Sequence, residues 1–314
     1  MEFIKLQPVF KSMIWGGTRL KDRYGFQSPH ESTGEAWVVS AHPNGDCLIE
    51  GGPYHGLTLS QLYATHRELF GASHAEQFPL LVKLIDARDN LSVQVHPDDA
   101  YAKTQEHGLG KTECWLVLDC EPDSEIIIGH TFETPAEFAQ AIASGDVQAH
   151  LNRFAIKPGD FFYIPAGTVH AICAGTLIYE IQQNSDLTYR IDDYGRKDAD
   201  GKPRPLHIDQ ALTVTRFPQE SLEVQPQVRH ESSAMLTTLL DNRFFTIERV
   251  ECFGETSIRC SGTFAVLGCL SGSLTVNGFA MDLGDHALAV DISSALHVSG
   301  HGTLIISTPN SAIR

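Results

Sequence analysis

The stretch that decides the fold is Leu91–Trp115, LSVQVHPDDAYAKTQEHGLGKTECW. Its first six residues alternate between apolar and polar side chains, which is typical of a β-strand. The polar members of this first strand are Ser92, Gln94 and His96. The end of the stretch alternates again and places Lys111 and Glu113 on one face of a second strand. Polar side chains turned toward a common interior do not build a core, so the pattern indicates a β-barrel that contains a site.

A second segment, Lys157–Glu180, carries a recognisable spacing of glycine, proline and histidine. From Gly159 the chain runs through five residues to Pro165, one residue to Gly167 and two residues to His170. The glycines permit tight turns, the proline ends a strand, and the histidine opens the next strand. This spacing resembles the second sequence motif of the cupin superfamily, whose histidine is a metal ligand inside a small β-barrel.

The segments depart from the cupin motifs in ways that point to one branch. Ala174 stands where the motif has asparagine, Gln94-x-His96 replaces His-x-His, and Glu113 follows an insertion. With these departures the sequence resembles type I mannose-6-phosphate isomerases, specifically their short bacterial form. The segments that carry the resemblance lie in order between about residues 5 and 215: IWGG, GEAW, FPLLVKLIDA, LSVQVHPDD, GKTECW, PAGTVHA and NSDLTYR.

The resemblance implies a mainly β fold, with a cupin (jelly-roll) β-barrel that carries helical insertions. It also implies a zinc-dependent aldose–ketose isomerase that interconverts mannose 6-phosphate and fructose 6-phosphate, with one Zn²⁺ per chain. The implied ligands are His96, Glu113, His170 and Gln94. Two imidazoles and a carboxylate suit a catalytic zinc site, although iron or manganese would also fit them. The role of the glutamine and the identity of the metal follow from the resemblance alone.

Aldose–ketose exchange needs a group that moves a proton and a cation that stabilises the enediol(ate). Lys111 and Glu180 are both candidates for proton transfer, and the residues leave this choice open. The resemblance makes Arg190 the catalytic arginine; without it, an ion pair with a neighbouring aspartate would be the simpler interpretation. The expected substrate-binding residues, including the phosphate contacts, are Ser92, Lys111 and Lys83.

Composition excludes several other functions. The 314 residues are 42% hydrophobic, which suffices for real cores, and carry a net charge of −16 that disfavours nucleic acid and anionic membranes as partners. There is no apolar run near 18 residues and no signal-peptide pattern at the start. Seven cysteines without a C-x-x-C pair fit a reducing compartment, so we expect a cytoplasmic protein. The partner that the resemblance implies is a phosphorylated hexose, and the oligomeric state stays open, a monomer being compatible with the sequence.

Two helices have recognisable ends. Thr134 followed by Pro135, with Gly145 at the far end, predicts a helix over Pro135–Ser144. Leu57–Phe70 has helical spacing of its apolar residues, with Ser60 as the expected cap. A third helix is expected within residues 206–216.

The chain after this helix predicts a second β domain. Residues 217–232 are polar with two prolines and read as a linker, which gives a catalytic domain over 1–232 and a smaller domain over 233–314. Gly284-Asp285 and His297 repeat the pattern of Gly159-Asp160 and His170, so we expect a degenerate cupin-like half. It lacks a Gln-x-His strand and a partnering glutamate, and we therefore expect it to bind no metal.

Two other functional classes are compatible with the metal set. An iron cupin of the oxygenase kind would need oxygen and would not need Gln94 or Lys111. A metal-binding cupin that acts on or senses another sugar or small molecule would bind its ligand without isomerising it. The combination of Lys111, Glu180 and Arg190 with the metal set favours the isomerase.

Overall fold

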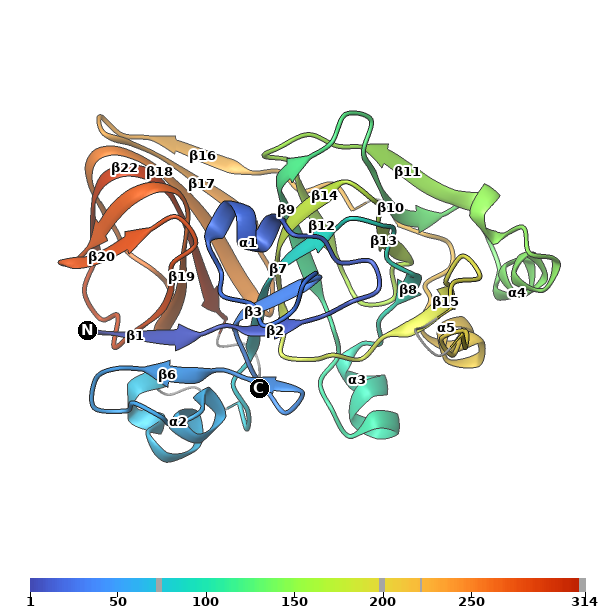
Figure 1. Cartoon of the computed structure of the whole chain (residues 1–314), viewed down its shortest axis with the longest axis horizontal. Coiled ribbons are helices and arrows are strands. Elements are labelled where there is room, and N and C mark those ends of the chain that lie inside the picture. Colours follow the sequence, from blue (N-terminus) through green and yellow to red (C-terminus); the bar gives the residue numbers. More distant parts are fainter. Residues whose placement is uncertain (72–74, 198–200, 221, 311–314) are drawn as a thin grey trace. The chain divides into compact units, whose positions relative to one another are not determined.

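The computed structural model describes residues 1–71, 75–197, 201–220 and 222–310, and most of its regular elements are strands (Figure 1). The mainly β prediction is confirmed. Internal contacts divide the chain into two compact units. One unit comprises Phe10–Ala36 and Lys83–Glu223, and the other comprises Met1–Val9, Trp37–Val82 and Val224–Arg314. Within the described ranges, no helix is long and apolar enough to cross a membrane.

The unit that contains the decisive stretch is built on two sheets. The five-stranded sheet has the order β11 (Leu151–Ala155), β10 (Glu125–His130), β13 (His170–Ile172), β8 (Val93–Val95) and β15 (Tyr189–Asp192). The six-stranded sheet has the order β12 (Phe161–Ile164), β9 (Glu113–Cys120), β14 (Thr176–Gln183), β7 (Leu80–Ala87), β3 (Glu35–Val39) and β2 (Val9–Lys11). The last three strands cross the division between the two units.

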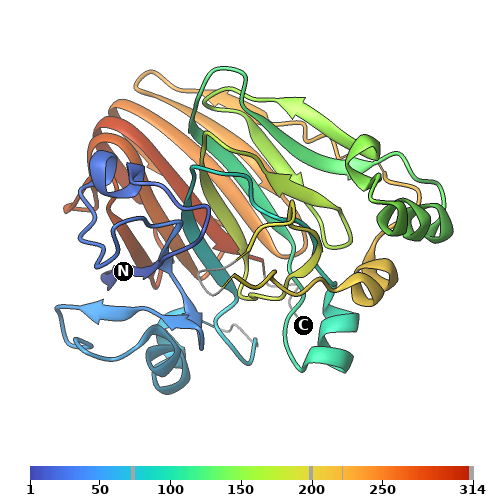
Figure 2. The ribbon, with the colours of Figure 1, turned by 45° about the vertical axis from the view of Figure 1, so that its right-hand side comes forward.

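An apolar layer joins these two sheets into a sandwich. Trp115 and Ile178 of the six-stranded sheet share one buried cluster with Ile126 and Ile172 of the five-stranded sheet. The outer face of the five-stranded sheet is covered by two helices, α4 (Pro135–Ser144) and α5 (Ile208–Val214), whose apolar residues pack on it (Figures 1 and 2). Among the described strands the sheets remain open and no single closed barrel forms, which refines the barrel prediction.

The predicted helices are present, with one error at a cap. Helix α4 begins after Thr134, whose side chain accepts a hydrogen bond from the Glu137 N–H, and ends at Gly145 in the left-handed conformation. Helix α2 (Leu59–Thr65) is capped by Thr58 in a capping box with Gln61, so the prediction of Ser60 as cap was wrong. The remaining short helices are α1 (Arg19–Tyr24), α3 (Asp99–Tyr101), η1 (Arg67–Phe70), η2 (Ala102–Glu106) and η3 (Val147–His150).

The other unit is organised around a nine-stranded sheet. Its path runs β16 (Gln227–His230), β17 (Ala234–Asp241), β18 (Phe245–Ile258), β22 (Leu296–Pro309), β19 (Phe264–Val276), β21 (His286–Val290), β1 (Glu2–Gln7) and β6 (Leu48–Glu50), with β20 (Phe279–Asp282) paired to β19. The long orange and red strands run side by side in Figure 2. A further pair joins β4 (Ala41–His42) to β5 (Gly45–Asp46).

The N-terminal strand is an internal member of this sheet. Strand β1 pairs with β21 on one side, Glu2 opposite Val290, and with β6 on the other. The predicted linker, residues 217–232, also contains β16, so its end is a strand and the linker prediction was wrong there. The division into 1–232 and 233–314 stays a prediction, because contacts group the first nine residues with the C-terminal strands.

The sequence repeat is visible in the hydrogen bonds of two turns. The N–H of Asp160 donates to the Lys157 carbonyl, and its carboxylate accepts from the Lys157 N–H at 2.9 Å. Asp285 makes the same two contacts with Asp282, again at 2.9 Å for the carboxylate. The two Gly-Asp turns therefore have the same local structure.

The strands that meet these turns correspond as well, and they differ where chemistry is expected. The N–H groups of Val117 in β9 and Cys269 in β19 each donate to the carbonyl of the aspartate in their turn. Four residues earlier, β9 has Glu113, whereas β19 has Ala265, which is buried in an apolar cluster. His297 is exposed and lies 2.7 Å from the Ser257 hydroxyl. Where β9 has a buried carboxylate, β19 therefore contributes an alanine to an apolar cluster.

We expect Phe3→Ala to destabilise the C-terminal sheet, because Phe3 packs on its apolar cluster and stacks on Phe279 with ring centroids 4.9 Å apart. The expected loss is about 2 kcal/mol in denaturant unfolding. Lys5→Ala, on the same face of β1, removes only a half-exposed ion pair with Asp285 and should cost less than about 1 kcal/mol. Equal effects of the two substitutions would contradict the role of β1 in this core.

Candidate active site

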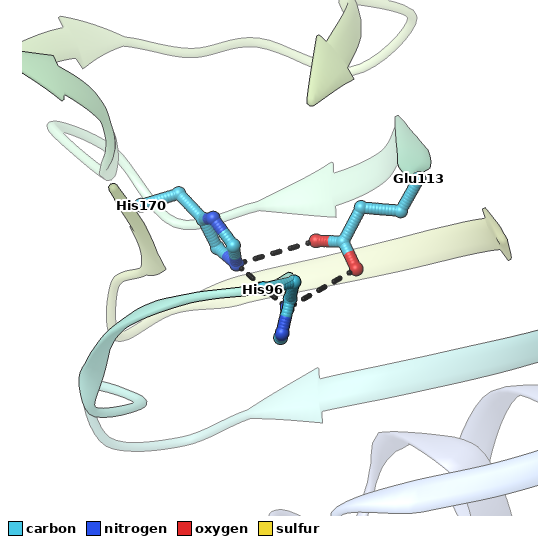
Figure 3. A group of neighbouring side chains, drawn as sticks. All are labelled: His96, Glu113 and His170. Carbon is cyan, nitrogen blue, oxygen red and sulfur yellow. Dashed lines mark hydrogen bonds and ion pairs between the residues drawn. The ribbon is translucent and has the colours of Figure 1, made fainter. Parts of the chain in front are cut away.

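Three potential metal ligands converge between the two sheets of the sandwich. His170 opens β13, His96 follows β8, and Glu113 opens β9, so the five-stranded sheet supplies both histidines and the six-stranded sheet supplies the carboxylate. All three side chains are buried, and their ligand atoms lie within 4.8 Å of one another (Figure 3). The two Nε2 atoms are 3.1 Å apart, and the Glu113 oxygens lie 3.5 Å from Nε2 of His96 and 3.4 Å from Nε2 of His170.

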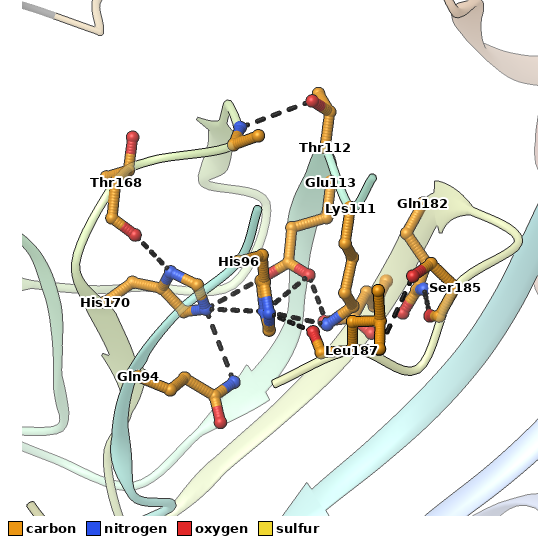
Figure 4. Close-up of polar contacts among 12 residues, drawn as sticks. Gln94, His96, Lys111, Thr112, Glu113, Thr168, His170, Gln182, Ser185 and Leu187 are labelled. Carbon is orange, nitrogen blue, oxygen red and sulfur yellow. Dashed lines mark hydrogen bonds and ion pairs between the residues drawn. The ribbon is translucent and has the colours of Figure 1, made fainter. Parts of the chain in front are cut away.

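Backbone carbonyls fix how the two imidazoles are presented. Nδ1 of His96 lies 2.7 Å from the Leu187 carbonyl oxygen, and Nδ1 of His170 lies 2.8 Å from that of Thr168 (Figure 4). A carbonyl can only accept, so each Nδ1 carries the proton and a neutral ring presents its Nε2 lone pair. Burial lowers the pKa of both histidines, that of His170 to about 3, which keeps the rings neutral.

Two further side chains contact the cluster from the side of a cavity. The Lys111 ammonium lies 2.6 Å from Oε2 of Glu113 and 2.9 Å from Nε2 of His96. The Gln94 amide nitrogen lies 3.3 Å from Nε2 of His170, and a half-turn of that amide would present its oxygen instead (Figure 4). Burial raises the pKa of Glu113. Two facing lone pairs beside a buried carboxylate form a donor set that suits a divalent cation.

The cavity has a volume of about 290 Å³ and is lined by six of the predicted site residues. These are Ser92, Gln94, Lys111, Lys83, Glu180 and Arg190. The structure therefore brings together the predicted metal ligands and the predicted catalytic and binding residues. Gln94 and Lys111 lie between the cavity and the cluster of potential metal ligands, because they line the cavity and also contact that cluster.

A buried ion-pair network forms one wall of the cavity. The Lys83 ammonium lies 3.7 Å from Glu35 and 3.4 Å from Glu180, and the Trp115 indole donates to Glu180 at 2.9 Å. Burial opposes the charge on Lys83, but the two glutamates outweigh it and raise its pKa. Burial likewise opposes the charge on Glu180, but Lys111 and Lys83 outweigh it and lower its pKa. Both groups are therefore charged at neutral pH.

Arg190 lines the cavity without an ion pair to any described carboxylate, so the alternative of a structural ion pair with a neighbouring aspartate is not realised. Its Nη1 donates to the Pro205 carbonyl at 2.9 Å, and its buried Nε has no hydrogen-bond partner among the described residues. Burial, and then the positive charge of Arg204, lower the pKa of Arg190.

Sequence reasoning missed three charged residues of the lining, Glu35, Asp186 and Arg204. Glu35 had a usable signal, since it is a charged residue at the start of the apolar strand that follows in the GEAW segment. Arg204 had none, because it follows the last strand of its sheet and reaches the cavity only through tertiary contacts.

Comparisons with known proteins agree with this geometry. Residues 3–123 match the family described as phosphomannose isomerase type I, catalytic domain. The chain is 44% identical to the probable mannose-6-phosphate isomerase GmuF of Bacillus subtilis, over 97% of this chain and 98% of that protein. It superposes on the crystal structure of the mannose 6-phosphate isomerase from Bacillus subtilis with a TM-score of 0.93 and 41% identity, covering 98% and 99% of the two chains.

A more distant crystal structure, of a mannose 6-phosphate isomerase bound with zinc and yttrium, shares the fold with a TM-score of 0.76 at 18% identity, covering 99% of this chain and 100% of that chain. The predicted cupin-like fold class and the predicted family are both confirmed. By its identity to full-length relatives, this chain belongs to the type I mannose-6-phosphate isomerases, a family of isomerases.

Proposed function

We propose that the protein is a zinc-dependent aldose–ketose isomerase that interconverts mannose 6-phosphate and fructose 6-phosphate through an enediol(ate). The observation that carries the proposal is the convergence of His96, Glu113 and His170 beside a cavity lined by charged acid–base groups. Membership of the family supports the substrate and the reaction type.

We propose that His96, Glu113 and His170 hold one Zn²⁺ per chain, with Gln94 as the fourth ligand. Support comes from the two neutral imidazoles that present Nε2 toward each other and from the buried carboxylate between them. Nitrogen and oxygen donors of this kind suit zinc, and zinc is bound in the relative named above. When bound, the ion supplies a Lewis acid for the sugar oxygens, which is worth several kcal/mol in such reactions.

Proton transfer between the two sugar carbons falls to Glu180 in this proposal, with Lys111 as the acid. An ionised carboxylate can accept a proton, and the lysines beside Glu180 keep it ionised. The Lys111 ammonium is held against Glu113 and therefore serves as a donor rather than a base. Lys83 is enclosed by Glu35 and Glu180, so we propose that it orients Glu180 at the edge of the substrate, while Ser92 offers its hydroxyl to the sugar.

Arg190 is proposed to stabilise the negative charge that develops on the reacting oxygens. A half-buried guanidinium that has no ion pair with a carboxylate of the described residues is an available positive charge, and its contact with Pro205 holds it in place. Such a fixed cation acts in the transition state without reorganisation at the moment of reaction.

Removing one strong ligand should remove the metal. His170→Ala is expected to lose stoichiometric zinc and isomerase activity, measured by elemental analysis and by a coupled assay for fructose 6-phosphate. His297→Ala is the matched control, because this histidine is exposed in the C-terminal sheet, and it should keep both. An active wild-type preparation without stoichiometric metal would sink the proposal, and ligand binding without turnover would favour a sugar-sensing protein.

Arg190→Ala should separate catalysis from binding. If the guanidinium stabilises charge mainly in the transition state, kcat falls by roughly 10²–10³-fold while KM changes much less. The metal should stay bound, since arginine is not a ligand. Steady-state kinetics beside a melting curve decides the matter: a wild-type kcat excludes the catalytic role, and a lowered Tm with unchanged kinetics indicates a structural one.

A further inference from the structure

The cations that line the cavity fall into two groups with different charge balance. They are Lys83, Lys111, Arg190 and Arg204. The two lysines are compensated, because Lys83 lies between two glutamates and Lys111 lies 2.6 Å from Glu113. Their positive charges are therefore largely neutralised by protein carboxylates. An incoming phosphate dianion would have to compete with these buried carboxylates for the lysines.

The two arginines belong to a group with excess positive charge. Arg190 has no ion pair with a described carboxylate, and Arg204 shares the buried carboxylate of Asp193 with Arg196. In the ion pairs of the described residues, Asp193 is thus the one carboxylate that compensates the three neighbouring guanidinium groups of Arg190, Arg196 and Arg204. Burial and the charges of Arg204 and Arg196 lower the pKa of Arg190, as expected where like charges accumulate. An anion would relieve this repulsion.

Asp193 holds the Arg204 guanidinium in a fixed orientation through two of its three nitrogens. Its Nε lies 2.8 Å from one oxygen of Asp193, and its Nη2 lies 2.5 Å from the other, a two-point contact that leaves Nη1 without a partner in that pair. The adjoining segment is fastened to β15, because Arg190 donates to the Pro205 carbonyl and the His207 N–H donates to the Arg190 carbonyl. The side chain needs little ordering before it binds a ligand.

We propose that Arg204 recognises the phosphate group of the sugar substrate and thereby sets the preference for phosphorylated over neutral sugars. This inference rests on the proposed isomerase function. It also answers a difficulty posed by composition, since a net charge of −16 repels a sugar phosphate unless cations gather at the site. Nη1 of Arg204 is the donor to a phosphate oxygen, and the neighbouring Arg190 is left to face the reacting end of the sugar.

The test compares Arg204→Gln, Arg204→Lys and Arg196→Gln with the wild type. KM and kcat are measured for mannose 6-phosphate, and the Kd of inorganic phosphate is measured by titration calorimetry on the zinc-loaded protein. Arg204→Gln should raise KM and the phosphate Kd by roughly 10- to 100-fold, the value of a charge-assisted hydrogen bond, while kcat stays within a few-fold. Arg204→Lys keeps the charge but not the two-point contact, so its KM and phosphate Kd should lie between those of the wild type and of Arg204→Gln. If Arg204→Gln does not fold, the comparison of Arg204→Lys with the wild type replaces it.

Arg196→Gln is the matched control, because it removes the same charge from the same Asp193 but does not line the cavity. It should leave KM and the phosphate Kd close to wild type. Equal effects of Arg196→Gln and Arg204→Gln would overturn the inference, as would an unchanged KM in Arg204→Gln while the wild type turns over. Phosphate binding that depends on Arg204 in a wild type without isomerase activity would instead reject the proposed function and leave the anion site standing.

Discussion

The structure around the site depends on the need to compensate charges that the protein buries. Glu35, Lys83, Lys111, Glu113 and Glu180 are each at most 8% exposed, although each would be stable in water. An isolated buried charge costs several kcal/mol, so the five side chains persist only because they contact one another. The ion pairs of Lys83 join β3, β7 and β14, and the hydrogen bond from Trp115 to Glu180 joins β14 to β9. Lys111 and Glu113 form a separate pair beside the two histidines, which backbone carbonyls orient. The apolar cluster behind them is the rigid support that makes these distances possible.

The sequence repeat allows the buried charges of the first half to be compared with the matching positions of the C-terminal half. Both halves form the same Gly-Asp turn beneath the same kind of strand, yet Ala265 stands where the first half has Glu113. At this position the C-terminal half can then pack an apolar cluster without a carboxylate to compensate. The first half instead keeps a polar interior that is useful only for binding and chemistry.

Local features of the sequence predicted more than its long-range ones. Helix α4 was found with its correct ends because Thr134, Pro135 and Gly145 act on the helix they flank. The convergence of His96, Glu113 and His170 could be predicted because strand alternation and the cupin spacing lie within short segments. The position of the N-terminal strand could not be predicted, since its partner β21 is far along the chain. Strand β16 was missed because it lies in a polar segment with two prolines, a composition that favours a linker over a strand. Lys83 showed that an interruption in an apolar strand can be a buried ion pair, which becomes visible only when both glutamates are located.

The position of β1 inside the C-terminal sheet has a consequence for synthesis on the ribosome. Lys5 pairs with Ala287, so β1 leaves the exit tunnel long before the strand with which it pairs. At 5 to 20 residues per second the interval is roughly 15 to 60 s. During that time β1 can pair with β6, but its other edge and the apolar face of Phe3 stay uncovered and available to nascent chains nearby. The order of translation and the order of the sheet are therefore opposed, and β1 needs protection until β21 has been made.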